Sequence, residues 1–193
     1  ECDFSYRRSI FNSTNKGKYI IFDIIFRLSV LPKPVLDYRD LKLKFSQGNP
    51  SILQIRQAVI EIRNKKFPFP IKAKNGNAGS FFKNPILSPE VYTQLKSTFV
   101  NSFGSHAVEK LDTEKFEELN QIKVPAAFLI ELCGLKDLEL GGAAINNNQP
   151  LVIINKTGKA TAIEVLGLAE KIKGVVLEKT GLSLQFEPEL IGF

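Results

Sequence analysis

The sequence lacks methionine and has one histidine and two cysteines among its 193 residues. A chain that begins at Glu1 without any methionine is expected to be cut from a longer protein. His106 lies in a polar stretch, so we do not expect it to act as a catalytic group or ligand. Cys2 and Cys133 are far apart and show no metal-ligand spacing. They predict reduced thiols and no metal site, with a disulfide between them as the alternative.

Long apolar runs are also missing. The longest apolar stretch, YIIFDIIF, is interrupted by Asp23, whereas a membrane-spanning helix needs about 18 or more apolar residues in a row. No secretory signal opens the chain. Hydrophobic residues nevertheless make up 44% of the sequence, which is typical of a folded globular protein. These features predict a cytoplasmic protein that does not contact the membrane.

Negative charge is the scarcer sign, so the chain carries a moderate excess of positive charge, with a formal net charge of +6. Such a balance suits nucleic acid, an anionic surface or a phosphate-bearing small molecule. The basic residues are scattered, and the densest run, RNKK at 63–66, has no aromatic and glycine-rich RNA motif beside it. A small phosphate-bearing ligand is therefore favoured, and a basic nucleic-acid-binding domain remains an alternative supported by charge alone.

Apolar periodicity and capping residues predict the elements of the first half. Alternating apolar side chains predict a strand over residues 19–28 with one buried face. Residues 40–45 are interpreted as a strand-like or irregular run. Ser51 and Gln54 have capping-box spacing and open a helix that should end near Lys66, before a turn-rich crossover that begins at residue 67. A second helix begins after Ser88, followed by an exposed loop or short helix over 100–121.

In the second half of the chain, the predicted helices and strands do not alternate regularly. A short buried helix runs from Pro125 towards Gly134, and paired strands cover 138–146 and 151–158. A long helix extends from the capping residue Thr161 to Gly181, and a final strand covers 182–190. The predicted fold class is α+β, because the regular strand and helix alternation of a doubly wound sheet is missing.

The stretch GNAGSFFKNP at 76–85 raises the question of function. Its glycines allow the backbone to approach a ligand closely and place Ser80 at the turn. The simpler interpretation is a tight turn before a strand. With CDFSYRRSIF, VLDYRDL, RNKKFPFP, PAAFLIELCGLK, GGAAINNNQPLVIIN and FEPEL in this order, the stretch resembles the UDP-N-acetylenolpyruvoylglucosamine reductase family, the UDP-N-acetylmuramate dehydrogenases of peptidoglycan precursor synthesis.

The resemblance implies a domain organisation and cofactors. Residues 1–67 would be the C-terminal part of a flavin-binding region of the vanillyl-alcohol-oxidase type, and 68–181 an α+β substrate-binding domain. Residues 182–193 would return a final strand with a catalytic glutamate to the flavin-binding region. NADPH and FAD are the implied cofactors, and most of the FAD would be held by a preceding region. The chain alone is therefore expected to be inactive.

The resemblance also assigns catalytic roles. Ser80 matches the group that protonates a substrate carbon after hydride transfer to the enolpyruvyl ether, a step that requires a positioned acid. Arg7, chosen over Arg8 because it directly follows Tyr6, matches the arginine that binds the substrate carboxylate. Glu189 matches the acid paired with that arginine. Considered alone, the arginine and the glutamate would be ordinary surface ion-pair partners.

The remaining matches concern substrate and cofactor. Tyr38, Lys66 and Asn84 match residues that hold the UDP moiety, chiefly its diphosphate. Arg63 matches a residue near the pyrimidine edge of the flavin. The implied partners are UDP-N-acetylglucosamine enolpyruvate and NADPH, with no nucleic acid and no membrane, and the protein is expected to be a monomer. A binding module that keeps the UDP-sugar site without catalysis is the alternative.

Overall fold

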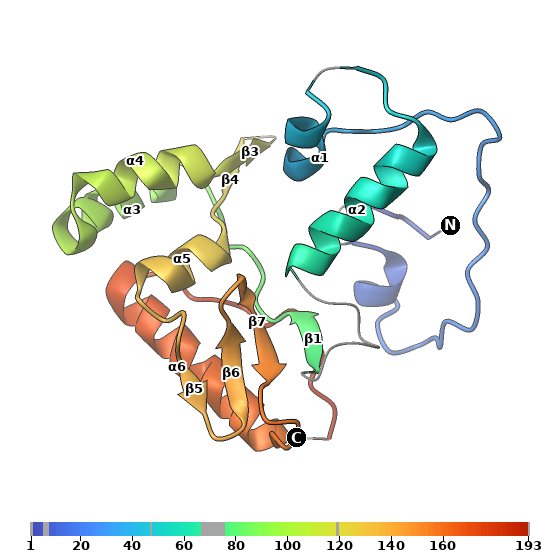
Figure 1. Ribbon diagram of the computed structural model, residues 1–193. Helices are drawn as coiled ribbons and strands as arrows, with labels where there is room; N and C mark the ends of the chain where they lie inside the picture. The colour runs from blue at the N-terminus through green and yellow to red at the C-terminus, as the bar shows by residue number, and fades with distance from the viewer. Residues whose placement is uncertain (1, 6–7, 47, 67–75, 119, 193) are drawn as a thin grey trace. The chain divides into compact units, whose positions relative to one another are not determined.

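A computed structural model describes residues 2–5, 8–46, 48–66, 76–118 and 120–192. Contacts divide the chain into two compact units, Glu1–Ile55 and Arg56–Phe193 (Figure 1). The predicted boundaries at 67/68 and 181/182 concern domains of the whole family and remain predictions. The crossover predicted from residue 67 lies mostly outside the described residues, because its positions 67–75 are not described.

The first unit contains little regular structure. It has a 3₁₀ helix, η1 (Ile10–Asn12), a short helix, α1 (Arg39–Lys44), and the beginning of α2 (Ile52–Lys66). The strand predicted over 19–28 is wrong for this structure, since these residues have no regular secondary structure. Phe22 is 99% exposed and Ile25 92% exposed. Alternation alone does not make a strand, because the backbone must also pair with a neighbouring strand.

Two further local predictions in this part of the chain have opposite outcomes. The strand-like interpretation of residues 40–45 is wrong, because α1 covers most of them and Leu41 is its buried residue. The helix that opens at Ser51 is confirmed as α2. Its capping box is reciprocal: Ser51 N donates to Gln54 Oε1 at 2.8 Å, and Gln54 N donates to Ser51 Oγ at 3.3 Å.

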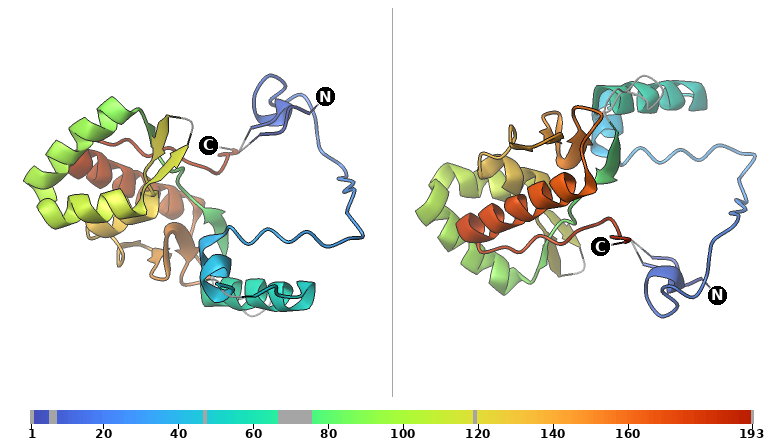
Figure 2. Two further views of the ribbon diagram at one scale, coloured as in Figure 1. Left: turned by 90° about the horizontal axis from the view of Figure 1, so that it is seen from above. Right: turned by 90° about the horizontal axis from the view of Figure 1, so that it is seen from below.

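The second unit contains a four-stranded antiparallel sheet in the order β1-β7-β6-β5. The strands are β1 (Asn77–Ser80), β5 (Glu139–Leu140), β6 (Ala143–Asn146) and β7 (Gln149–Asn155). The predicted pairing of 138–146 with 151–158 is confirmed by β6 and β7. The stretch 138–146 is nevertheless two strands, β5 and β6, separated by a turn at Gly141 and Gly142. Helix α6 (Ala162–Thr180) lies along this sheet (Figures 1 and 2). Its predicted capping box at Thr161 and C-terminal glycine, Gly181, are both present.

The second sheet has three short antiparallel strands in the order β2-β4-β3. They are β2 (Ile86–Leu87), β3 (Phe116–Glu118) and β4 (Gln121–Lys123). Helices α3 (Pro89–Phe103), α4 (Ser105–Glu114) and α5 (Ala126–Leu132) complete the unit and confirm the helices predicted after Ser88 and Pro125. The polar stretch 100–121, predicted as a loop or short helix, contains α4 together with the unpredicted strand β3.

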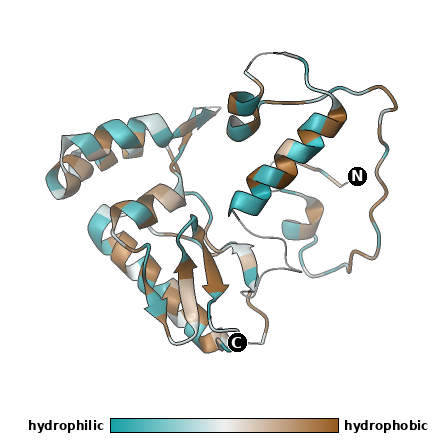
Figure 3. Cartoon of the chain, in the orientation of Figure 1, coloured by the Kyte–Doolittle hydropathy of each residue, from teal (hydrophilic) through white to brown (hydrophobic). Residues whose placement is uncertain are grey.

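One hydrophobic core joins these helices and sheets. It includes Phe82, Phe99, Leu129 and Ile172, each at most 1% exposed. Figure 3 shows the apolar residues on β7 and in stripes along α6, which is the pattern expected of a helix with one face on a sheet. Cys2 and Cys133 are both free, as predicted, and burial raises the pKa of the Cys133 thiol. Among the described helices, none is long and apolar enough to cross a membrane.

The predicted final strand is only partly correct. Leu182 and Leu184 are buried and Phe186 is half-buried, as the alternation predicts. The segment nevertheless forms only an isolated bridge, between Phe82 and Phe186, in place of a strand. The pattern of antiparallel sheets, covering helices and a common core confirms the α+β fold class.

Candidate functional site

Ser80 lies at the end of β1, where a β-bulge interrupts the pairing with β7. Ser80 is opposite Val152, and the register shifts between Asn77 and Ser80. Gly79 has φ = 79°, a conformation that L side chains rarely adopt. Asn77 Oδ1 accepts a hydrogen bond from Gly79 N at 2.9 Å and holds this turn. A bulge redirects the following side chain, so the glycine determines the direction of Ser80.

The residues after Ser80 lie between β7 and the C-terminal segment. Phe81 N donates to Leu151 O of β7 at 2.7 Å, and Phe81 O accepts from Glu187 N at 3.0 Å. Lys83 N donates to Gln185 O at 2.8 Å. The segment that carries Glu189 is therefore hydrogen-bonded antiparallel to the segment that follows Ser80.

This pairing brings the neighbourhoods of Ser80 and Glu189 together. Ser80 is one residue, and Glu189 two residues, from the hydrogen bond between Phe81 and Glu187. Two residues span at most about 7 Å. Glu189 is exposed and follows a bend at Pro188. Ser80 and Glu189, which are distant in the sequence, thus flank the same backbone pairing.

Asn84 has a structural contact that sequence reasoning did not predict. Its Oδ1 accepts a hydrogen bond from Ala126 N at 3.0 Å, at the first residue of α5. This satisfies a backbone donor that has no partner within the helix. The N–H₂ group of Asn84 is a separate donor on the same amide carbon, and the bond to Ala126 N does not use it. The side chain can therefore cap α5 and donate to a ligand simultaneously.

The other predicted residues lie elsewhere in the chain. Tyr38 is 60% exposed at the N-cap position of α1 in the first unit. Arg63 is exposed on α2, and Lys66 is the last residue of that helix. Arg7 lies outside the described residues, as does the side chain of Lys66. Ser80 and the Glu189 segment thus lie beside the same short backbone pairing, whereas Asn84 lies beyond its other end, at the start of α5.

A second acid near Ser80 was missed. Glu187 is half-buried, its Oε2 atom is buried, and its backbone N–H is the group that binds Phe81. The motif FEPEL contains both acids, and only Glu189 was selected from it. The signal that could have identified Glu187 is the alternation of Leu182, Leu184 and Phe186, because an acid directly after such a run lies next to buried positions.

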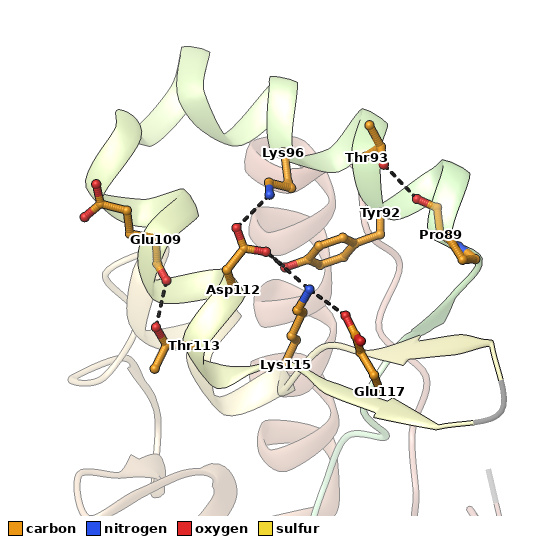
Figure 4. A network of polar contacts seen from close by, with 9 residues as sticks. All are labelled: Pro89, Tyr92, Thr93, Lys96, Glu109, Asp112, Thr113, Lys115 and Glu117. Carbon is orange, nitrogen blue, oxygen red and sulfur yellow. Dashed lines mark hydrogen bonds and ion pairs between the residues drawn. The ribbon is translucent and has the colours of Figure 1, made fainter.

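A polar network joins α3, α4 and β3 (Figure 4). The Tyr92 hydroxyl donates to Asp112 Oδ1 at 2.9 Å, and Lys96 Nζ binds Asp112 Oδ2 at 2.6 Å. Lys115 lies 3.4 Å from Asp112 and 2.6 Å from Glu117. The hydrogen bond from Lys96 lowers the pKa of Asp112, and burial raises the pKa of Tyr92.

Three charged residues of the polar stretch 100–121 take part in this network, namely Asp112, Lys115 and Glu117. Both lysines lie near the Tyr92 ring, with Nζ 5.9 Å from the ring centroid for Lys96 and 4.8 Å for Lys115. The carboxylate of Asp112 is paired with Lys96, Lys115 and the Tyr92 hydroxyl. We therefore interpret the network as a brace that fixes α3 against α4 and β3.

Comparison with known proteins gives one family and many relatives. The family described as UDP-N-acetylenolpyruvoylglucosamine reductase, C-terminal domain, matches residues 70–191. A UDP-N-acetylenolpyruvoylglucosamine reductase of Alcanivorax borkumensis is 37% identical over 99% of this chain and 52% of its own length. The Flavobacterium johnsoniae protein of the same name is 36% identical over 99% of this chain and 54% of its own.

A further relative of the same name, from Neisseria meningitidis, is 36% identical over 97% of this chain and 52% of its own length. The chain thus spans about half the length of the curated relatives it matches. The similarity extends across the first unit as well as the second.

Proposed function

The chain belongs to the UDP-N-acetylenolpyruvoylglucosamine reductase family, and we propose that it supplies the substrate-binding part of such an enzyme. The proposed reaction is the NADPH- and FAD-dependent reduction of UDP-N-acetylglucosamine enolpyruvate to UDP-N-acetylmuramate in peptidoglycan precursor synthesis. The enzyme would act as a monomer in the cytoplasm. The observation that carries the proposal is the pairing of residues 81–83, which follow Ser80, with residues 185–187, which precede Glu189.

The chemistry requires a proton donor close to an enolate clamp. Negative charge accumulates on the enolpyruvyl carboxylate when hydride arrives, so fixed donors there lower the barrier. Arg7 offers a planar fork of N–H groups to that carboxylate, and Glu189 is the acid that pairs with this arginine. Ser80 then donates its hydroxyl proton to the carbon that has become electron-rich. The bulge at Gly79 orients the serine for this step.

The UDP moiety requires donors for a diphosphate. Asn84 supplies an amide N–H₂ whose orientation is fixed by the bond between its Oδ1 and Ala126 N. Lys66, at the end of α2, supplies a positive charge, and Tyr38 supplies a hydroxyl donor. The net charge of +6 attracts such a ligand.

The described residues offer one group that fits FAD. Arg63 is exposed on α2, and its rigid N–H fork matches the acceptor-rich pyrimidine edge of a flavin. When bound, FAD supplies the hydride that NADPH provides. Since the chain spans about half the length of its relatives, we infer that it has no turnover alone.

The test is turnover by the complete protein. It should oxidise NADPH in the presence of UDP-N-acetylglucosamine enolpyruvate and form UDP-N-acetylmuramate. Arg7→Ala should slow product formation and leave flavin reduction by NADPH unchanged, while the neighbouring Arg8→Ala serves as the matched control. A wild-type protein that binds UDP but forms no product would instead be a non-catalytic UDP-sugar-binding module. Salt-sensitive DNA or RNA binding that UDP does not compete away would favour a nucleic-acid function.

A further inference from the structure

We call β1 together with residues 81–83 the Ser80 strand. Few backbone contacts attach the C-terminal segment that carries Glu189 to this strand. Glu187 N donates to Phe81 O and Lys83 N donates to Gln185 O, one on each side of the bridge between Phe82 and Phe186. No regular strand forms over residues 181–192. Backbone pairing of this extent specifies register weakly, and a slip of one residue would turn every side chain to the other face.

Contacts between side chains can fix the register that the backbone pairing leaves weakly specified. The Phe186 ring lies 5.4 Å from the Phe81 ring and 5.8 Å from the Phe82 ring, measured between centroids. The Phe81 and Phe82 rings are 5.7 Å apart. Phe81 is 5% exposed and Phe82 1% exposed, so both partners belong to the core. Such edge and tilted contacts favour one mutual arrangement of the rings over others.

Helix α6 also contacts the Phe186 ring. Lys173 Nζ lies 4.5 Å from the centroid of Phe186, within the range of a cation–π contact. Lys173 is itself placed by an ion pair with Glu170 Oε2 at 3.1 Å. The Phe186 ring therefore lies in an aromatic clasp made by Phe81, Phe82 and Lys173, three residues before Glu189.

We propose that Phe186, held in this aromatic clasp, is the positioning residue that sets the register of the Glu189 segment against the Ser80 strand. The inference rests on the proposed function and adds a determinant of its geometry. A displacement of about 1 Å in a catalytic group can lower a rate by roughly a hundredfold. Loosening the clasp should therefore impair the step that uses Ser80 and Glu189 and leave flavin reduction by NADPH unchanged.

The experiment uses the complete protein and measures the two half-reactions separately. Phe186→Leu keeps apolar volume but loses the ring, and should slow reduction of the enolpyruvyl substrate roughly ten- to a hundredfold. Phe186→Tyr keeps the ring and should restore a rate near that of the wild type. Lys173→Met keeps the aliphatic stem and should slow the same step roughly two- to fivefold. This variant keeps the test available if Phe186→Leu does not fold.

Phe99→Leu is the matched control, since Phe99 is fully buried against the rings of Phe103 and Phe128. It should lower stability and leave the ratio of the two half-reactions unchanged. Equal loss of both half-reactions in Phe186→Leu, no loss in either, or the same selective loss in Phe99→Leu would overturn the positioning role. A wild-type protein that never reduces the enolpyruvyl substrate would instead refute the proposed function, and the positioning role with it.

Discussion

Asn84 has two roles that substitution can separate. Its Oδ1 accepts the hydrogen bond from Ala126 N at 3.0 Å, and its N–H₂ group is proposed to bind the diphosphate. Asn84→Ala removes both. Asn84→Asp keeps an oxygen that can accept from the helix, because Asn and Asp are about equally good caps, but it removes the N–H donors and places a negative charge next to the phosphates.

The magnitudes follow from these contacts. Loss of a cap costs about 1 kcal/mol, which should lower the Tm of the longer complete protein by less than the roughly 2–4 °C expected for 150–250 residues. Loss of a hydrogen bond to a charged group costs about 1.5–3 kcal/mol, so UDP should bind roughly 10- to 150-fold more weakly. Asn84→Asp should therefore keep the wild-type Tm and lose at least as much UDP affinity as Asn84→Ala.

Thermal unfolding and calorimetric titration of the complete protein with UDP measure the two effects. Wild-type UDP affinity in Asn84→Asp would show that Asn84 only caps α5. An unchanged Tm in Asn84→Ala would show that the bond to Ala126 contributes nothing to stability. Either result would refute the reasoning for that role, and neither depends on the other.

Two further predictions concern stability. Gly142→Ala should lower the free energy of unfolding by about 1–3 kcal/mol, because a Cβ there would lie 2.8 Å from the Ala160 backbone. Gly174→Ala within α6 places a Cβ with nothing within 4 Å, so it should raise the free energy of unfolding by roughly 0.5–1 kcal/mol. Denaturant unfolding of both variants checks this, and equal effects would contradict it. The folded-state pKa of Asp112 is lowered, chiefly by Lys96, so its contribution is present above the unfolded pKa and is lost as pH falls through the folded pKa. Asp112→Asn should accordingly flatten the acid limb of a Tm-against-pH curve, and an unchanged limb would refute this.

Local signals predicted the helices well. The reciprocal bonds of Ser51 with Gln54 and of Thr161 with Glu164 join residues three apart, so the pattern that predicts each helix start lies within one turn. The short strands β2 and β4 were missed because two or three residues carry too little periodicity. The alternation over 19–28 was misleading, because no described residue pairs with it as a strand.

The part of the candidate site that depends on a local sequence pattern could also be predicted. The motif around Ser80 is local, and Gly79 in its left-handed conformation agrees with the expected turn. The bond from Asn84 to Ala126 spans 42 residues, and the clasp around Phe186 joins three distant segments. Such contacts depend on the packed fold and leave no spacing in the sequence by which they could be recognised.

The hydroxyl of Ser80 is the proposed proton donor, and Ser80→Ala in the complete protein tests this role. The exposed Ser183 gives a matched control, Ser183→Ala. We predict that flavin reduction by NADPH persists in Ser80→Ala while formation of UDP-N-acetylmuramate falls by about a hundredfold or more, with both half-reactions normal in the control. Product formation at the wild-type rate, or an equal loss of both half-reactions, would contradict the assignment of Ser80 as the proton donor.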